Sequence, residues 1–389
     1  MGGGSDYIYL DHASMMPVDP RVIEFARELL RSPGNPASLH SAGLAGKQAV
    51  EDAREKVADL INAKDPRSVI FTGSVTEANN LAIRGVSTRN MNRGKKVAAS
   101  AIEHISVLNS MKELQKSGFE FSMIPVDSAG LVDVEALKGV VSKDTVVTSI
   151  MHGNNEIGTV EPIKDLAKAV HDLGIYIHVD AAASAGRIPI DVQADDIDLL
   201  TLSSNDLNGP QGAGALYVKP GIRLQPIILG GGQEKGLRSG TENLFALAGM
   251  GEASRIAKEE MSAESDRLKR IRDGLIEEIM SIEGAHLTGH PTERLPHHAS
   301  FRFGGIEGES IQLNMNNLGI AVSTGSACSS ITLEPSHVLL AIGLKHEEAH
   351  GSMVMTLGRS NDIGQVPRIA DAVKETVTRL RGFSPLGAE

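Results

Sequence analysis

Short apolar runs alternate with amphipathic helical patterns through the first two hundred residues of the chain. Residues 145–150, 175–179 and 198–202 form runs that are apolar enough to be buried on both faces of a sheet. Residues 163–173 separate two of these runs and have the apolar spacing of a helix. Parallel strands need a crossover connection, which is usually a helix. This order therefore predicts an α/β fold whose mostly parallel sheet is flanked by helices.

The pattern changes near residue 215. Residues 243–282 form one long helical stretch, and shorter strands and helices follow it. A chain of 389 residues is too long for one small domain. We therefore expect a large α/β domain over residues 16–255, and a smaller C-terminal α+β domain built from residues 1–15 and 256–389.

The composition excludes several classes of function. The net charge is −11, whereas phosphate binding needs clustered Lys and Arg, so neither nucleic acid nor an anionic membrane is expected as a partner. No apolar run approaches the roughly 20 residues of a membrane-spanning helix. Cys328 is the only cysteine, so an internal disulfide is impossible and a reducing cytoplasm is the expected location.

A turn of small residues separates a predicted strand from a predicted helix near residue 73. The sequence Phe-Thr-Gly-Ser-Val-Thr-Glu contains Gly73, Ser74 and Thr76. Free N–H groups and the helix dipole at such a turn form an anion site. A simple capping turn would have the same sequence, and the residues alone favour neither reading.

Other polar residues follow the buried runs. Asp180 ends the strand over residues 176–180, at the edge where open parallel sheets bind their ligands. His104 follows a strand and opens a helix, and Asn155 lies just beyond another buried run. A lone histidine is more often structural, but several polar strand ends at one rim of a sheet predict a binding site.

Cys328 lies in the segment Ser-Thr-Gly-Ser-Ala-Cys-Ser-Ser, residues 323–330. The segment is small, polar and flexible, so it presents a thiol and does not bury one. This context favours a reactive or metal-binding cysteine over a core residue.

One further motif matches a metal site. The segment His346-Glu347-Glu348-Ala349-His350 has the H-E-x-x-H pattern of zinc peptidases, in which His346 and His350 would hold zinc and Glu347 would be the base. The pattern is short and lies in a charged segment that we expect to be exposed between two elements. A zinc peptidase therefore stays a remote alternative.

The motifs together resemble the IscS/NifS-type cysteine desulfurases, which belong to the class V aminotransferase group of pyridoxal 5'-phosphate (PLP) fold type I. The likeness extends over nearly the whole chain. Its segments are residues 9–13, 35–40, 71–80, 151–158, 178–181, 209–212, 238–243 and 325–328.

The resemblance implies how the cofactor would be held. Thr76 and Ser203 would bind its phosphate, and Thr241 would reach the phosphate from the second subunit of a homodimer. His104 would stack on the pyridine ring, and Asp180 would pair with the ring nitrogen and strengthen the electron sink.

The resemblance also implies a substrate and a partner. Asn155 would face the ring hydroxyl or the substrate, L-cysteine, and Cys328 would attack its sulfur and carry it as a persulfide. An IscU-like iron–sulfur scaffold would receive that sulfur and would contact the C-terminal region, including residues 384–386.

The sequence departs from the family at the residue that holds PLP. Asn205 and Asp206 stand where the family has a His-Lys pair, and the chain has no lysine between Lys168 and Lys219. Aspartate has no amine, so it cannot form a Schiff base with PLP or exchange it with substrate. Further departures are expected in the same pocket: Ala183 for a glutamine, Val354 for the arginine that clamps the substrate carboxylate, and Met15 and Met16 for two threonines.

Two main hypotheses follow from these departures. In the first, the chain is an iron–sulfur assembly component, and its own L-cysteine desulfuration is absent or strongly impaired. Cys328 would then carry sulfur from another donor, or ligate a nascent 2Fe–2S cluster together with the scaffold. In the second, the chain is an active desulfurase that converts L-cysteine to L-alanine and sulfur with PLP bound non-covalently.

Overall fold

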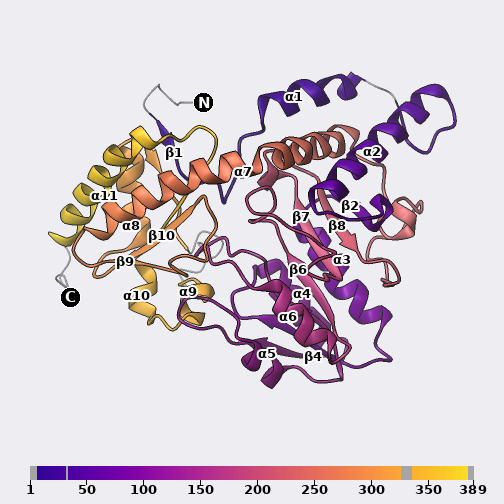
Figure 1. Ribbon diagram of the computed structural model, residues 1–389, viewed down its shortest axis with the longest axis horizontal. Coiled ribbons are helices and arrows are strands. Elements are labelled where there is room, and N and C mark those ends of the chain that lie inside the picture. The colour runs from indigo at the N-terminus through magenta and orange to yellow at the C-terminus, as the bar shows by residue number, and fades with distance from the viewer. Residues whose placement is uncertain (1–6, 32–33, 326–334, 384–389) are drawn as a thin grey trace.

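The computed structural model describes residues 7–31, 34–325 and 335–383. Cys328 and residues 384–386 lie outside these ranges. Within them, a seven-stranded sheet has the order β2-β8-β7-β6-β5-β3-β4 (Figure 1). Its strands are β2 (Val69–Thr72), β3 (Lys96–Ser100), β4 (Glu120–Ile124), β5 (Thr145–Ser149), β6 (Tyr176–Asp180), β7 (Leu199–Ser203) and β8 (Gly214–Val218).

The sheet is mostly parallel, as the sequence predicts. The pairs β4–β3, β3–β5, β5–β6 and β6–β7 are parallel, whereas β8 is antiparallel to both β7 and β2. The carboxyl ends of the parallel strands therefore meet at one edge, where polar residues of several strands come together.

Helices cover both faces of this sheet because alternate strand side chains point to opposite sides. Val69 and Phe71 of β2 belong to one apolar core, and Ile70 belongs to the core on the other face. The first core includes helices α2 (Ser41–Leu60) and α6 (Ile163–His171), and the second includes α3 (Val75–Arg89) and α4 (Ile105–Gln115). The short helices α1 (Pro20–Arg27) and α5 (Val134–Val140) add to the first layer.

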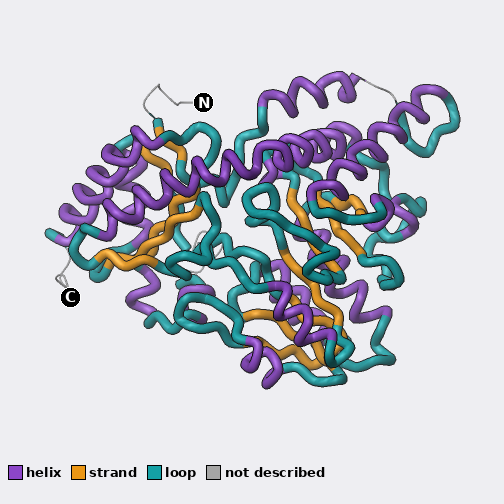
Figure 2. The backbone as a smooth tube through the Cα atoms, viewed as in Figure 1, coloured by secondary structure: helices purple, strands orange, loops and turns teal. Residues whose placement is uncertain are grey.

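A second, smaller group of strands lies apart from the large sheet (Figure 2). Strands β12, β10 and β9 form an antiparallel sheet, and β1 pairs in parallel with β11. Their bounds are β1 (Ile8–Tyr9), β9 (Ala285–Leu287), β10 (His298–Phe303), β11 (Ile320–Ala321) and β12 (Ser352–Thr356). The helices of this region are α8 (Gly308–Asn317), α9 (His337–Ala341), α10 (His346–His350) and α11 (Val366–Arg381).

The long helix α7 (Leu244–Met280) joins the two regions and passes along both (Figure 1). Its first part, from Ala246 to Ala257, packs in the core of the large sheet, and its later part, from Leu268 to Ile279, packs in the core of the small one. The division at residue 255 falls inside this helix, and the domain limits 16–255 and 256–389 stay a prediction.

Several of these elements differ from the sequence expectation. Strands β4, β8 and β9 and helix α5 are absent from the predicted pattern. The segment His346–His350 is a helix, α10, where an exposed segment between two elements was expected. None of the helices in the described ranges is both long and apolar enough to cross a bilayer.

Candidate active site

A cavity of about 430 Å³ opens at the carboxyl edge of the large sheet. Its wall combines the ends of β5, β6 and β7 with the start of α3 and with residues 323–325 from the smaller region. Five of the predicted site residues line it: Thr76, His104, Asn155, Asp180 and Ser203.

The start of α3 forms one end of the cavity. Ser74 is the N-cap of α3, and its hydroxyl accepts a hydrogen bond from the N–H of Glu77 at 3.2 Å. The N–H groups of Val75 and Thr76 then remain as first-turn donors that intrahelical carbonyls do not satisfy. Thr76 and Ser203 add hydroxyl groups to the same wall. This end therefore fits a phosphate dianion, since free donors and the helix dipole both favour negative charge.

Close packing of the backbone fixes the position of this turn. A Cβ atom on Gly214 of β8 would lie 2.5 Å from the carbonyl carbon of Ser74, so β8 can approach the turn only with glycine there. Glu77 accepts hydrogen bonds from the N–H of Gly73 at 2.9 Å and from Arg238 Nε at 2.9 Å. Gly73 and Ser74 thus build the turn, and their direct contact with a ligand stays a prediction.

Asp180 lies at the end of β6 and is held by two hydrogen bonds. Its Oδ1 accepts from the N–H of Ala182 at 3.0 Å, and its Oδ2 accepts from Asn79 Nδ2 at 2.7 Å. Asn79 is fully buried on α3, and its Oδ1 accepts from the Thr201 hydroxyl at 2.7 Å. The carboxylate of Asp180 can only accept, so it fixes the amide with Nδ2 towards Asp180, and the Thr201 hydroxyl donates to the other end.

The same amide also reaches His104. Asn79 Nδ2 donates to Ser106 Oγ at 2.9 Å, and Ser106 Oγ lies 2.8 Å from His104 Nδ1. The Ser106 N–H donates to this Nδ1 at 3.2 Å, so Nδ1 is an acceptor and the neutral ring carries its hydrogen on Nε2. One buried amide therefore positions both side chains that would contact a pyridine ring.

Asn79, Ser106 and Thr201 were not recognised from the sequence. Asn79 lies within the motif over residues 71–80, but it occupies the interior of a helix and not a strand end. A polar residue on the buried face of an amphipathic helix was the one available indication, since such a group needs an internal partner.

Asp206 follows β7 in the short 3₁₀ helix Asn205–Leu207, and both Asn205 and Asp206 line the cavity. Burial raises the pKa of the Asp206 carboxyl to about 6, and the negative charge of Asp180 acts in the same direction. A hydrogen bond from Ser203 and the positive charge of Arg187 both lower this pKa. Asn205 Oδ1 is buried and has no hydrogen-bond partner among the described residues.

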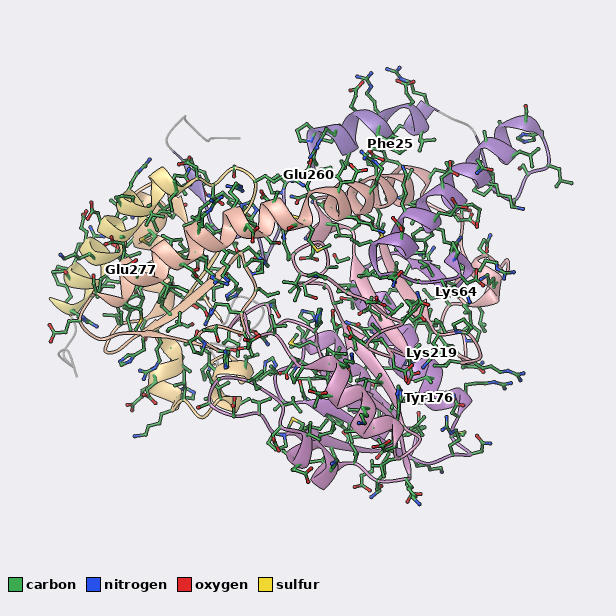
Figure 3. All side chains as sticks on the ribbon, in the orientation of Figure 1. Phe25, Lys64, Tyr176, Lys219, Glu260 and Glu277 are labelled. Carbon is green, nitrogen blue, oxygen red and sulfur yellow. The ribbon has the colours of Figure 1, made fainter. Side chains whose placement is uncertain are left out.

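A second, much smaller cavity lies on the other side of Asp206. It has a volume of about 10 Å³, enough for one water molecule, and Arg187 and Glu260 line it. Glu260 projects from α7 (labelled in Figure 3). Burial lowers the pKa of Arg187 to about 10, and its buried Nε has no hydrogen-bond partner among the described residues.

Most of the departures from the family pattern line the cavity. Ala183 and Val354 are part of its wall together with Asn205 and Asp206. The expectation that Met15 and Met16 share this pocket is wrong. Met16 is buried with its sulfur 2.8 Å from Arg187, and Met15 is 42% exposed.

The carboxyl groups in the cavity outnumber the basic groups. Asp180, Asp206 and Glu156 line it, and His104 is the one basic side chain among its described lining residues. Burial raises the pKa of Glu156 to about 7, although the Ser336 hydroxyl donates a hydrogen bond to it. No described residue supplies a Lys or Arg to this wall.

Thr241 and Cys328 are not among the described lining residues. Thr241 is exposed and is not part of the cavity wall of its own chain, so a contact from a second subunit stays a prediction. Cys328 lies outside the described residues. Ser323, Thr324 and Gly325, which precede it in the sequence, do line the cavity.

The His346–His350 motif lacks a complete set of metal ligands within the described ranges. The two histidine rings lie 4.7 Å apart between centroids on α10. Glu348 is used as a cap, accepting from the N–H of Lys345 at 2.9 Å. Across the described ranges, no group of three or more His, Cys, Asp or Glu side chains is arranged to hold a metal ion.

The large parallel sheet with its strand-end cavity is the architecture of PLP fold type I. The family model "Aminotransferase class-V" matches residues 8–369 of the chain. The curated relative "Cysteine desulfurase IscS 1" of Archaeoglobus fulgidus is 50% identical over 379 residues, covering 97% of this chain and 99% of the relative. "Cysteine desulfurase IscS" of Methanosarcina thermophila is 42% identical, covering 97% and 94%.

Solved structures of similar proteins indicate the same family. A "NIFS-like protein" superimposes with a TM-score of 0.90 at 34% identity, over 96% of this chain and all of that one. The structure "SspA in complex with cysteine" has a TM-score of 0.80 at 32% identity, over 90% and 98%. The chain belongs to the class V aminotransferase family and is of the IscS/NifS cysteine desulfurase type, whose cofactor is PLP.

The cavity fits this cofactor only in part. The donors at the start of α3 suit the phosphate, and the fixed carboxylate of Asp180 suits a protonated ring nitrogen. A covalent link needs a lysine amine, and the described lining residues provide none.

Proposed function

We propose that this chain is an iron–sulfur cluster assembly component whose own L-cysteine desulfuration is absent or strongly impaired. The observation that carries the proposal is the position of Asp206 on the cavity wall, with no lysine among the described lining residues. Asp206 would then occupy the place where a desulfurase of this family forms its Schiff base. A carboxylate cannot form that bond.

The substrate end of the cavity supports the same proposal. L-Cysteine carries a carboxylate, and Val354 would stand where the family places an arginine for it. Ala183 would likewise offer no hydrogen bond to the ring hydroxyl. The described lining residues include no Lys or Arg, so a substrate carboxylate would enter without a strongly cationic partner.

The residues that remain would still hold PLP non-covalently. When bound, PLP supplies an electron sink for bond cleavage next to an amino group. Thr76 and Ser203 would bind its phosphate, with Thr241 of a second subunit in a homodimer. Asp180 would pair with the ring nitrogen, His104 would stack on the ring, and Asn155 would face the ring hydroxyl.

Cys328 would be the functional thiol in the cytoplasm. Residues 323–325 line the cavity, so the segment that carries Cys328 begins at the site. The Cys328 thiolate would take the outer sulfur of a persulfide donor, whose own thiolate leaves, or supply one thiolate to a 2Fe–2S cluster. Such clusters take four ligands, mostly cysteine, so an IscU-like scaffold would supply the others.

An active desulfurase is the second candidate, and the names of the curated relatives favour it. In that reaction the C–S bond of L-cysteine breaks, the sulfur joins the Cys328 sulfur, and L-alanine leaves. PLP bound without a covalent link would have to support every step.

Sulfide release from L-cysteine separates the two candidates. The assay would run anaerobically with excess PLP and a reductant, with Cys328→Ser as the matched control. We expect no release above that control, together with cluster formation on an IscU-type scaffold that depends on Cys328. Clear turnover that depends on Cys328 would contradict the proposal, and so would cluster formation that Cys328→Ser leaves unchanged.

A further inference from the structure

A hollow of about 460 Å³ opens at the opposite edge of the large sheet, where β6 begins and β8 ends. Its volume is within the range of small-molecule sites. The described lining residues include two arginines, Arg89 and Arg223, and no Asp or Glu. This local composition is the reverse of the chain as a whole, whose net charge is −11. The other lining residues are Asn90, Met91, Asn92, Tyr176 and Gly221.

Hydrogen bonds fix the two walls that carry these arginines. Arg89 is in the last turn of α3, and Arg223 lies in the loop that follows β8. Asn90 Nδ2 donates to the carbonyl of Arg223 at 3.4 Å, and the N–H of Gln225 donates to the carbonyl of Gly85 at 2.9 Å. The loop and the end of the helix are therefore held together, so both guanidinium groups project from a defined backbone.

A third arginine lies beside the hollow. The guanidinium carbon of Arg93 is 4.4 Å from the centre of the Tyr176 ring, and its Nη2 donates to the carbonyl of Gly174 at 2.6 Å. Tyr176 itself lines the hollow. Stacking and hydrogen bonding therefore hold Arg93 at the rim, and three segments of the chain each contribute one cation.

The acids at this edge of the sheet are paired with other groups. Asp196 and Asp198 contact Lys219 Nζ at 2.6 and 3.3 Å, and they contact the ring nitrogens of His171 at 3.0 and 2.8 Å. Lys219 and Tyr176 lie near each other at this end of the sheet (Figure 3). Neither acid lines the hollow, and their charge is balanced by Lys219.

Arg89 alone would have a simpler explanation, because a cation in the last turn of a helix interacts favourably with the helix dipole. Arg93 and Arg223 come from other segments, and that effect does not account for them. We infer that this hollow binds a phosphate chain, such as that of a nucleoside triphosphate or of inorganic tripolyphosphate. Guanidinium groups match phosphate oxygens with paired hydrogen bonds, and three cations suit a ligand with several negative charges.

Calorimetric titration of the full-length protein with tripolyphosphate and with ATP tests the inference. The buffer is free of magnesium, its ionic strength is constant, and sulfate is the reference for non-specific anion binding. We expect saturable binding of both phosphate chains and none of sulfate. Equal affinities would assign the site to the phosphate chain itself, whereas tighter binding of ATP would assign it to a nucleotide.

Variants locate the binding. Arg89→Gln and Arg223→Gln should each weaken both ligands about tenfold, because each removes charge-assisted hydrogen bonds. Arg379→Gln removes an exposed arginine from the last turn of α11, the position that Arg89 has in α3, and should change neither affinity. Thr76→Val alters the phosphate end of the main cavity and should also change neither affinity. Circular dichroism of each variant checks that folding is unchanged.

Three results would overturn the inference. The first is the absence of saturable binding, and the second is an equal loss of affinity in Arg379→Gln. The third is a loss in Thr76→Val but not in the Arg89 and Arg223 variants, which would place the anion in the main cavity. None of these results bears on Cys328, so cluster formation that depends on Cys328 remains a separate test of the proposed function.

Discussion

Asn79 is the residue whose replacement should disturb the site most without touching a ligand. Its amide makes three hydrogen bonds, to Asp180, Ser106 and Thr201, and all four side chains are buried. Asn79→Ala leaves the Asp180 carboxylate with one donor fewer and the Thr201 hydroxyl without this acceptor. A buried polar group that loses its partner costs about 1–3 kcal/mol, so the variant should lose about 2–4 kcal/mol of unfolding free energy.

The neighbouring residue provides the control. Asn80 also lies on α3, but its amide donates only to the Thr76 carbonyl, at 3.0 Å in an exposed contact. Urea unfolding followed by circular dichroism should therefore show a large loss for Asn79→Ala and a change within about 0.5 kcal/mol for Asn80→Ala. Asn79→Ala should also weaken binding of 4'-deoxypyridoxine 5'-phosphate about tenfold, because Asp180 and His104 lose their shared support. Equal stability of the two variants would refute the argument that this amide organises the site.

Two further predictions concern charge and protonation. Asp206→Lys should allow covalent capture of PLP, because the lysine amine condenses with the aldehyde and water leaves. Borohydride reduction fixes the product for detection by mass spectrometry. Asp371→Lys, the control at an exposed position, should gain no such site-specific adduct. Burial raises the pKa of Glu161 to about 8, so the native state keeps a proton that the unfolded chain loses, and stability falls as pH rises from the ordinary glutamate value towards 8. Glu161→Gln should flatten that part of the curve in urea unfolding at several pH values, and an unchanged slope would argue against a protonated native Glu161.

The periodicity of the sequence was sufficient to predict the centre of the sheet but not its edges. Strands β5, β6 and β7 are buried on both faces, so their apolar runs could be recognised directly. Strand β4 is an edge strand with one of its five residues buried, and Met123 within it is 59% exposed, so it lacks such a run. Strand β8 begins at Gly214, directly after a glycine-rich stretch with the composition of a turn.

The site residues, too, could be predicted from the sequence only in part. Asp180, His104 and Asn155 were predictable because a polar residue after a buried strand falls at the ligand-binding edge of a parallel sheet. Asn79 belongs to the interior of a helix, and Thr201 lies inside β7, so the position of neither residue along its element indicates a site. Their role depends on a contact between α3 and β7, which only the tertiary structure reveals.

The structure gives a physical reason why one half of the cavity fits a cofactor and the other half does not. The buried hydrogen bonds of Asp180 and Asn79 connect helix α3 with α4, β6 and β7. Replacing either residue would therefore also destabilise the fold. Asp206, Ala183 and Val354 belong to the wall of an open cavity, where a changed side chain meets solvent or ligand and leaves the hydrogen bonds of the sheet intact. Side-chain changes at these positions should therefore cost the fold little. The contact that Asp180 would make with the ring would persist for the same reason, because Asp180 also connects these elements.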